Sequence, residues 1–277
     1  MVLQIAGISI KIDLAADQYP TTDYFNKACS AYSISGEARY DFKVTMGDYN
    51  KAKRDIKAVF SRNTISYSEY GNESFFFSDS SECCIQWKEK TATLAFAPKV
   101  FRYDVLFMDY IKMLVSFIAI ERGGLPLHSS AVYNEIKGGL LFFCPSGGGK
   151  TTIAGLMASH WKVLSDEFNM VMPRNGTYFV HSTPFTAPEN HYLCTSGSAP
   201  LRKLFKLSKG ASTLCQEMPH RDKYMSLGQS IYSIIATQTL GDKILENMDA
   251  LCRCIPMQIL TFAKNPSIAV EIGNAIG

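Results

Sequence analysis

The sequence has little net charge, few tryptophans and histidines, and no long apolar run that is free of charge. Its formal net charge is only +3 over 277 residues, so nothing suggests a general nucleic-acid-binding protein, which usually has a concentrated basic patch. The most apolar long stretch, Val105–Ile120, contains Asp109 and Lys112. It is too short and too charged to cross a membrane and instead predicts a helix buried on most sides of a soluble protein.

The sequence also lacks the features of a secreted or zinc-stabilised protein. Its first residues, "MVLQIAGISIKID", have neither the basic start nor the long apolar segment of a secretory signal. We therefore expect a cytoplasmic location, with the eight cysteines as reduced thiols. The adjacent Cys83 and Cys84, and the pair Cys252 and Cys254, do not have zinc-ligand spacing, and packing roles are expected for them. No internal repeat or low-complexity segment is visible.

The first hundred residues contain short segments rich in aromatic and β-branched residues, separated by short polar breaks. This spacing predicts a meander of antiparallel strands and a small β-rich N-terminal domain over residues 1–100. The segments are "ISYSEY" (Ile65–Tyr70), "SFFFSD" (Ser74–Asp79), "CCIQW" (Cys83–Trp87) and "TATLAFAP" (Thr91–Pro98).

The β-rich pattern ends at a long helix, which is predicted over Tyr103–Arg122. Gly123 and Gly124 are expected to end this helix, because glycine readily adopts the left-handed conformation. Strands and helices then alternate, which predicts an α/β domain over residues 101–277. Strands are expected at residues 129–135, 138–144, 162–173, 177–182 and 257–263. Helices are expected at residues 151–159, 224–238, 242–254 and 266–277.

The run "FFCPSGGGKTT", Phe142–Thr152, changes from apolar residues to a serine, three glycines, a lysine and two threonines. That order predicts a strand, a loop with little side-chain bulk and a helix. A phosphate loop needs converging backbone N–H groups, glycines that let the anion approach, a lysine that neutralises charge and a hydroxyl that binds Mg²⁺. Residues 144–151 meet these requirements, except that Cys144 stands where the usual pattern has its first glycine.

We expect this loop to bind the phosphates of a nucleotide, with Lys150 reaching the β- and γ-phosphates and Thr151 binding the metal. The alternative is a glycine-rich turn that carries a lysine by chance, and the expected strand and helix on either side argue against it. The expected cofactors are ATP and Mg²⁺. The residues expected to hold the nucleotide are Pro145, Ser146, Gly147, Gly148, Gly149, Lys150, Thr151 and Thr152.

An acidic pair follows the loop closely. Asp166 lies 16 residues after Lys150, with Glu167 next to it. A helix of about ten residues carries the chain ~15 Å away from the phosphates. Four or five extended residues bring it ~13–17 Å back, so the pair is expected beside the phosphates at once. The alternative is a pair of strand-end carboxylates in solvent.

Leu125–Val171, which contains His128, the glycine loop and the acidic pair, resembles the C-terminal catalytic domain of HPr kinase/phosphatase. Proteins of that family share a fold with phosphoenolpyruvate carboxykinase. The resemblance is looser through "STPFTAPEN" and "APLRKLFKL", and the first hundred residues give no independent match. It implies an α/β fold class, with a phosphoenolpyruvate carboxykinase/HPr kinase-like P-loop domain preceded by the smaller β-rich N-terminal domain.

The resemblance also implies residue roles. His128 takes the position of the active-site histidine, although it could equally cap a strand or fill the core. Asp166 and Glu167 take the paired-aspartate positions, one of which is the proton acceptor, and the glutamate leaves open which of the two does that work. The implied catalytic residues are Asp166, Glu167, His128 and Lys150, and the implied metal ligands are Thr151, Asp166 and Glu189.

The function expected from the loop, the acidic pair and the resemblance is that of a serine/threonine-type kinase that uses ATP and Mg²⁺. The expected partner is a peptide or protein with an acceptor hydroxyl, with no nucleic acid and no membrane; self-association into a homo-oligomer stays open. The short motif by which HPr kinases engage their protein substrate has no match, so HPr is not assigned as the acceptor. Two rivals remain: a nucleotide-binding regulatory or scaffold protein without transfer, which Cys144 favours, and a nucleoside-triphosphatase that uses water.

Overall fold

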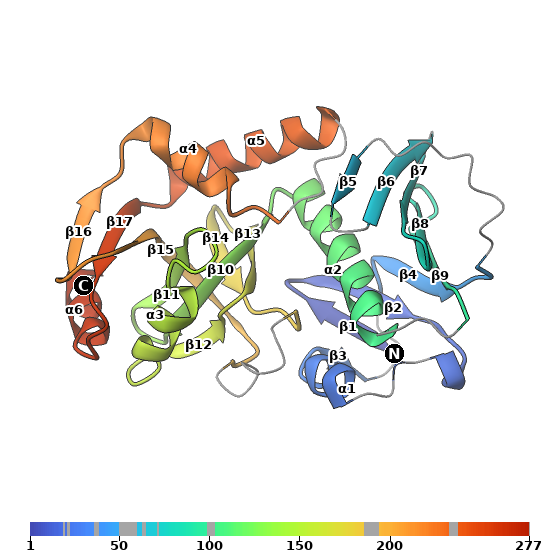
Figure 1. Ribbon diagram of the computed structural model, residues 1–277, viewed down its shortest axis with the longest axis horizontal. Coiled ribbons are helices and arrows are strands. Elements are labelled where there is room, and N and C mark those ends of the chain that lie inside the picture. Colours follow the sequence, from blue (N-terminus) through green and yellow to red (C-terminus); the bar gives the residue numbers. More distant parts are fainter. Residues whose placement is uncertain are drawn as a thin grey trace. The chain divides into compact units, whose positions relative to one another are not determined.

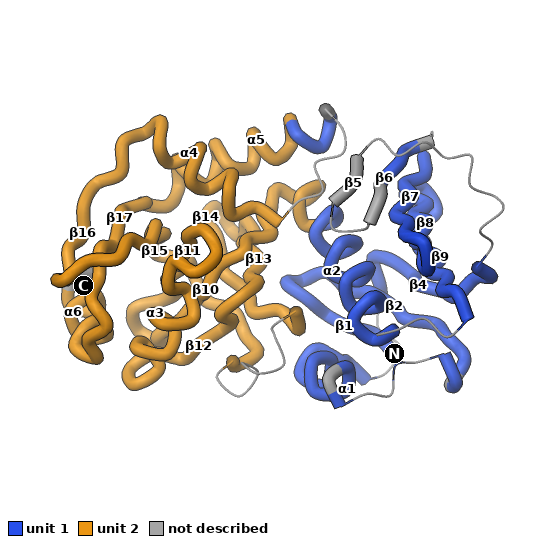
Figure 2. Tube along the Cα trace, in the orientation of Figure 1, with its two compact units in different colours: residues 1–118, 233–241 blue, residues 119–232, 242–277 orange. Residues whose placement is uncertain are grey.

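The computed structural model describes residues 1–18, 20, 23–35, 39–49, 60–62, 65–70, 72–98, 103–185, 194–232 and 238–276. The chain is a mixed α/β protein with two large β-sheets (Figure 1). It divides into two compact units (Figure 2): unit 1 comprises Met1–Ile118 and Ser233–Gly241, and unit 2 comprises Ala119–Tyr232 and Asp242–Gly277. None of the helices in the described part of the chain combines the length and the apolar character needed to span a membrane.

Unit 1 is built on a nine-stranded sheet in the order β3-β1-β2-β4-β9-β8-β7-β6-β5. Its strands β6 to β9 pair consecutively and antiparallel, which confirms the meander expected between Ile65 and Pro98. The strands are β1 (Val2–Ile5), β2 (Ile8–Ile12), β3 (Ser33–Ile34), β4 (Phe42–Met46), β5 (Phe60–Arg62), β6 (Ile65–Tyr70), β7 (Glu73–Phe77), β8 (Ser81–Gln86) and β9 (Thr91–Phe96). Two short helices, η1 (Ala16–Gln18) and α1 (Asp23–Ser30), lie between β2 and β3 in the sequence.

The long helix α2 (Tyr103–Glu121) confirms the helix expected there, and Gly123 follows it with a positive φ of 79°. Its apolar residues pack within unit 1: the ring of Phe117 lies edge-on to that of Phe76, with 5.4 Å between centroids. The Tyr110 hydroxyl is 2.8 Å from the Ser81 hydroxyl. The compact units divide near Ile118, inside α2.

Unit 2 contains an eight-stranded sheet in the order β11-β10-β13-β14-β15-β17-β16, with β12 also paired to β10. Strand β15 pairs antiparallel with β14 and parallel with β11, so β11, β10, β13, β14 and β15 close into a ring. The strands are β10 (Leu125–Asn134), β11 (Gly138–Phe143), β12 (Lys162–Ser165), β13 (Phe168–Arg174), β14 (Thr177–His181), β15 (Ser198–Lys209), β16 (Leu214–Glu217) and β17 (Met257–Phe262). The helices are α3 (Lys150–Met157), α4 (His220–Gly228), α5 (Gln238–Cys254), whose residues 238–241 belong to unit 1, and α6 (Ile268–Ile276).

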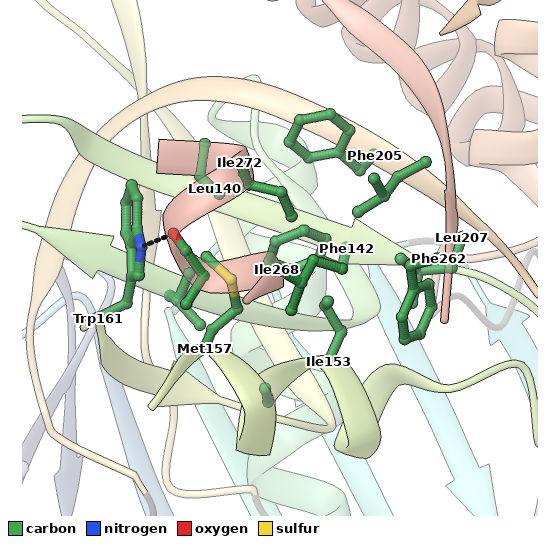
Figure 3. Packing of buried hydrophobic residues seen from close by; sticks show 14 of the residues in the cluster. Leu140, Phe142, Ile153, Met157, Trp161, Phe205, Leu207, Phe262, Ile268 and Ile272 are labelled. Carbon is green, nitrogen blue, oxygen red and sulfur yellow. Dashed lines mark hydrogen bonds between the residues drawn. The ribbon is translucent and has the colours of Figure 1, made fainter. Parts of the chain in front are cut away.

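A buried hydrophobic cluster fixes α3 against the strands that precede it (Figure 3). Phe142 of β11 and Ile153 of α3 both belong to this cluster and are fully buried. Trp161, just after α3, donates a hydrogen bond of 3.3 Å from its indole nitrogen to the carbonyl oxygen of Ala269 in α6 (Figure 3). Burial of these large side chains stabilises the β11–α3 connection, and so it holds the intervening glycine loop in place.

Two expected elements differ from the observed ones. The single strand expected over residues 162–173 is two strands, β12 and β13, with a bend at Asp166 and Glu167. The helix expected over residues 224–238 ends with α4 at Gly228. After it the chain runs against β10, where the N–H of Tyr232 donates to the Pro126 carbonyl oxygen at 2.9 Å, and residues 233–237 lie outside the described residues. The backbone after Gly228 thus pairs with β10 instead of continuing the helix.

The remaining expected elements of unit 2 agree with the structure to within a few residues, apart from β15 and β16, for which no strand was expected. Asn175 and Gly176 join β13 to β14 with φ values of 51° and 77°, as a two-residue hairpin turn requires. All eight cysteines are free thiols.

Candidate functional site: a pocket between the glycine loop and an acidic bend

The glycine loop, Cys144–Gly149, connects the end of β11 to the first residue of α3. Gly147 and Gly149 have positive φ values of 74° and 108°, a region that other residues rarely adopt. A Cβ atom on Gly149 would also lie 3.1 Å from the ring of Phe262. Both glycines are therefore needed for the chain to reverse from the strand into the helix.

Cys144 fits at the start of the loop because Gly148 has no side chain. A Cβ atom on Gly148 would lie 2.5 Å from the Cys144 sulfur and 3.0 Å from the Pro145 carbonyl oxygen. The Cys144 side chain is buried in the hydrophobic cluster under α3. Burial raises the pKa of its thiol and the charge of Lys150 lowers it by less, so Cys144 is a neutral packing residue at physiological pH.

We predict that Gly148→Ala distorts the loop and weakens nucleotide binding, and that Cys144→Gly relieves part of this effect. Cys144→Gly alone is expected to keep or improve binding, although removal of a buried side chain lowers the stability of the fold by roughly 1–3 kcal/mol. A double-mutant cycle in which calorimetry gives the ATP affinity of all four proteins tests the coupling. Additive effects of the two substitutions would contradict it, and a large loss of affinity in folded Cys144→Gly would give the thiol a role in binding.

Lys150 is the first residue of α3 and is buried, with 7% exposure. Its ammonium group donates a hydrogen bond of 3.0 Å to the Cys144 carbonyl oxygen, so the side chain lies back over the loop. The N-terminus of α3 adds backbone N–H groups that have no partner within the helix, together with the positive end of the helix dipole. The loop and the start of α3 thus form an anion-binding environment.

The acidic pair lies in the bend between β12 and β13, and the hydroxyl oxygen of Ser165 holds this bend. That oxygen accepts hydrogen bonds from the N–H groups of Glu167 at 3.3 Å and of Phe168 at 3.2 Å. Asp166 is 2% exposed, while Glu167 is half-buried. Ser165 had not been picked out as a site residue from the sequence. Its signal was a serine directly before two acidic residues, a position from which a side chain can cap the following N–H groups.

His128 of β10 is attached to the same bend. Its Nδ1 lies 3.0 Å from the Glu167 carbonyl oxygen, which also accepts a hydrogen bond of 3.1 Å from the N–H of Ser129. A carbonyl oxygen can only accept, so Nδ1 carries the hydrogen in this bond. The histidine is therefore held in one orientation beside the acidic pair.

These segments surround one pocket with a volume of about 420 Å³. It is lined by His128, Ser146, Gly147, Gly149, Lys150, Thr151, Thr152, Asp166 and Glu167. Of the other residues expected in the site, Pro145 and Gly148 belong to the loop but do not line the pocket, and Glu189 lies outside the described residues. The structure thus brings together residues from β10, the glycine loop, α3 and the β12–β13 bend.

The donor set of the pocket suits a phosphate group together with a hard divalent cation. Backbone N–H groups and Lys150 attract an anion, whereas the Thr151 hydroxyl and the Asp166 carboxylate supply the oxygen ligands that Mg²⁺ prefers. No cluster of three or more histidine, cysteine or acidic side chains suited to a metal occurs among the described residues. Mg²⁺ is commonly held by one or two protein oxygens and by substrate phosphates, and the residues present fit that arrangement.

Comparison with known proteins gives a family match and distant similarity to solved structures. A search among curated protein sequences gives no match. The HPr(Ser) kinase/phosphatase from Coxiella burnetii is similar with a TM-score of 0.30 and 8% sequence identity, over 55% of this chain and 87% of that chain. That likeness is too distant to place any residue. The model of the family described as SynChlorMet cassette protein ScmC matches residues 99–266, more than half of the chain. The chain therefore belongs to the ScmC family of SynChlorMet cassette proteins.

Proposed function

We propose that the protein is an ATP- and Mg²⁺-dependent phosphotransferase that moves the γ-phosphoryl group of ATP to a hydroxyl. The acceptor proposed is a serine or threonine of a peptide or protein, as the resemblance to HPr kinase/phosphatase implies. The observation that carries the proposal is the pocket in which Lys150 and Thr151 face the same space as Asp166, Glu167 and His128. Phosphoryl transfer needs that combination of anion binding and carboxylates, because catalysis depends on positioning and on neutralising charge.

The glycine loop and α3 form the nucleotide end of the proposed site. Positive φ values at Gly147 and Gly149 let the backbone turn around an anion, and a Cβ built on Gly147 has no atom of the described residues within 4 Å apart from its chain neighbours. The Lys150 ammonium is already at the loop, where its present partner is the neutral Cys144 carbonyl. Exchange of that neutral acceptor for a charged phosphate oxygen gives a stronger hydrogen bond, because both partners then carry charge.

The acidic bend forms the acceptor end. Thr151 and Asp166 are the proposed ligands of Mg²⁺, which when bound neutralises part of the charge on the phosphates. Asp166 or Glu167 takes the proton of the acceptor hydroxyl. At the same time the oxygen of that hydroxyl forms a bond to the γ-phosphorus. The bond from that phosphorus to the bridging oxygen breaks, and ADP leaves with the electron pair. His128 orients the bend through its hydrogen bond to the Glu167 carbonyl.

ATP turnover measured with and without peptides from a cell extract separates this function from its rivals. We expect turnover to depend on Mg²⁺ and to rise when peptides supply acceptor hydroxyls. Equal turnover without peptides would favour a nucleoside-triphosphatase that uses water. Binding of ATP without turnover under either condition would favour a regulatory or scaffold protein, the reading that Cys144 at the head of the loop suggests.

A further inference from the structure

Ser130 in β10 is a buried polar residue that the proposed function does not use. Its side chain is 0% exposed, and its hydroxyl has no hydrogen-bond partner among the described residues. The neighbouring Ser129, equally buried, donates to the Leu127 carbonyl oxygen at 3.2 Å. Because a buried hydroxyl without a partner destabilises the fold, the unsatisfied group at Ser130 needs an explanation.

The pairing of β10 with β11 shows which way Ser130 points. Ser130 lies opposite Phe142, and residues directly opposite in an antiparallel pair have their side chains on the same face of the sheet. Phe142 belongs to the hydrophobic cluster together with Ile153 of α3 (Figure 3). The Ser130 hydroxyl is therefore on the face that α3 covers. His128, two residues earlier and so on the same face, lines the pocket.

The other edge of β10 places Ser130 opposite the acidic bend. Ala131 pairs with Ser165 of β12, and His128 pairs with Phe168 of β13. Between these two pairs lie residues 129 and 130 of β10 and residues 166 and 167 of the bend. Both pairs have the same antiparallel register, which places Ser130 opposite Asp166. Side chains opposite each other in this way have Cβ atoms about 4.5–5.5 Å apart in regular strands, within reach of a hydroxyl-to-carboxylate hydrogen bond after a rotamer change.

We propose that Ser130 is a positioning residue for Asp166: in the nucleotide-loaded protein its hydroxyl donates a hydrogen bond to a carboxylate oxygen of Asp166. The inference rests on the proposed function, in which Asp166 is a ligand of Mg²⁺. The bond is charge-assisted and fixes the direction in which the carboxylate presents its other oxygen to the metal. The hydroxyl has no partner among the described residues and gains one when the nucleotide binds, so the free-energy contribution of Ser130 to stability is expected to be unfavourable without nucleotide and favourable with it.

Ser130→Ala tests this proposal through two measurements on the full chain, the midpoint of thermal unfolding and the affinity for ATP. Without nucleotide, the midpoint is expected to stay the same or to rise, because the substitution removes an unsatisfied buried hydroxyl. With ATP and Mg²⁺, the affinity is expected to fall about 10- to 100-fold, the loss typical of a hydrogen bond to a charged group. With ATP and a chelator in place of Mg²⁺, the affinity is expected to match that of the parent.

Ser129→Ala is the matched control, because it removes an equally buried hydroxyl on the opposite face of the same strand. It is expected to lower the unfolding midpoint and to leave the Mg²⁺-dependent affinity unchanged. A parent protein that binds no ATP would overturn the proposed function, and this inference with it. A parent that binds ATP with Mg²⁺ while Ser130→Ala binds it equally well would overturn the role of Ser130 and leave the proposed function standing.

Discussion

Lys150→Ala is expected to lower the affinity for ATP by about 30- to 150-fold or more, which corresponds to roughly 2–3 kcal/mol. The substitution removes the positive charge that lies at the glycine loop, and it does so at a buried residue with 7% exposure. An interaction with phosphate in this environment is screened less by water than one at the surface. Isothermal titration calorimetry with ATP and Mg²⁺ measures the change directly.

Two further variants separate the charge of Lys150 from its packing. Lys150→Met keeps most of the buried stem and is expected to lose as much affinity as the alanine variant. Lys162→Ala removes an exposed lysine that pairs with Glu135 at 2.8 Å, and it is expected to bind ATP as the parent does. Unchanged affinity in folded Lys150→Ala would refute the proposed phosphate site.

Asp166→Asn and Glu167→Gln are expected to reduce phosphoryl transfer by about 10²- to 10⁴-fold, the usual cost of losing a positioned general base or an equivalent catalytic group. Both keep the size of the side chain and remove its charge, so the bend held by Ser165 is expected to persist. Initial rates of transfer at saturating ATP and Mg²⁺ measure this effect. Parent-like rates in both variants would refute the roles assigned to the acidic pair.

The ATP affinity of the same two variants distinguishes the metal ligand from the base. Without Mg²⁺, removal of a carboxylate beside the triphosphate relieves repulsion, so affinity is expected to be kept or to rise. With Mg²⁺, Asp166→Asn is expected to lose the gain in affinity that the metal brings, because Asp166 is a proposed ligand. Retention of that gain in Asp166→Asn would assign the metal contact elsewhere.

Much of the local structure was predictable because it depends on neighbouring residues. The sequence "NG" at Asn175 and Gly176 supports positive φ values, and the hairpin between β13 and β14 follows from it. The glycine loop between β11 and α3 was likewise expected from a strand signal, three glycines and a helix signal. The placement of Lys150, Asp166 and Glu167 around one pocket agrees with the chain-length argument that an acidic pair so close in sequence returns beside the loop.

The parts that were not predicted depend on distant contacts. "YMSLGQSIYSIIATQ" has helical periodicity throughout, yet α4 ends at Gly228 because Ser230 and Tyr232 hydrogen-bond to the backbone of β10. The long strand β15 was missed because its partners, β14, β11 and β17, lie far from one another in the sequence. Periodicity alone carries no information about such partners.

The bend at the acidic pair illustrates the same limit within the candidate site. The residues from Lys162 to Pro173 suggest one strand, and the register with β10 is indeed continuous across the break. The bend arises where the Ser165 hydroxyl oxygen accepts hydrogen bonds from the N–H groups of Glu167 and Phe168. Ser130 could not be identified from the sequence for a related reason: only the pairing of β10 on both of its edges places it on the face covered by α3 and level with the acidic bend.

The most direct measurement of the central claim follows the γ-phosphate of labelled ATP. Parent protein, Asp166→Asn and Glu167→Gln are incubated with labelled ATP, Mg²⁺ and cell-extract peptides, and mass spectrometry locates the label. The account predicts label on serine or threonine hydroxyls of peptides with the parent and little or none with either variant. Label that stays in ATP, or that appears only as inorganic phosphate, with a parent protein that binds ATP would contradict it.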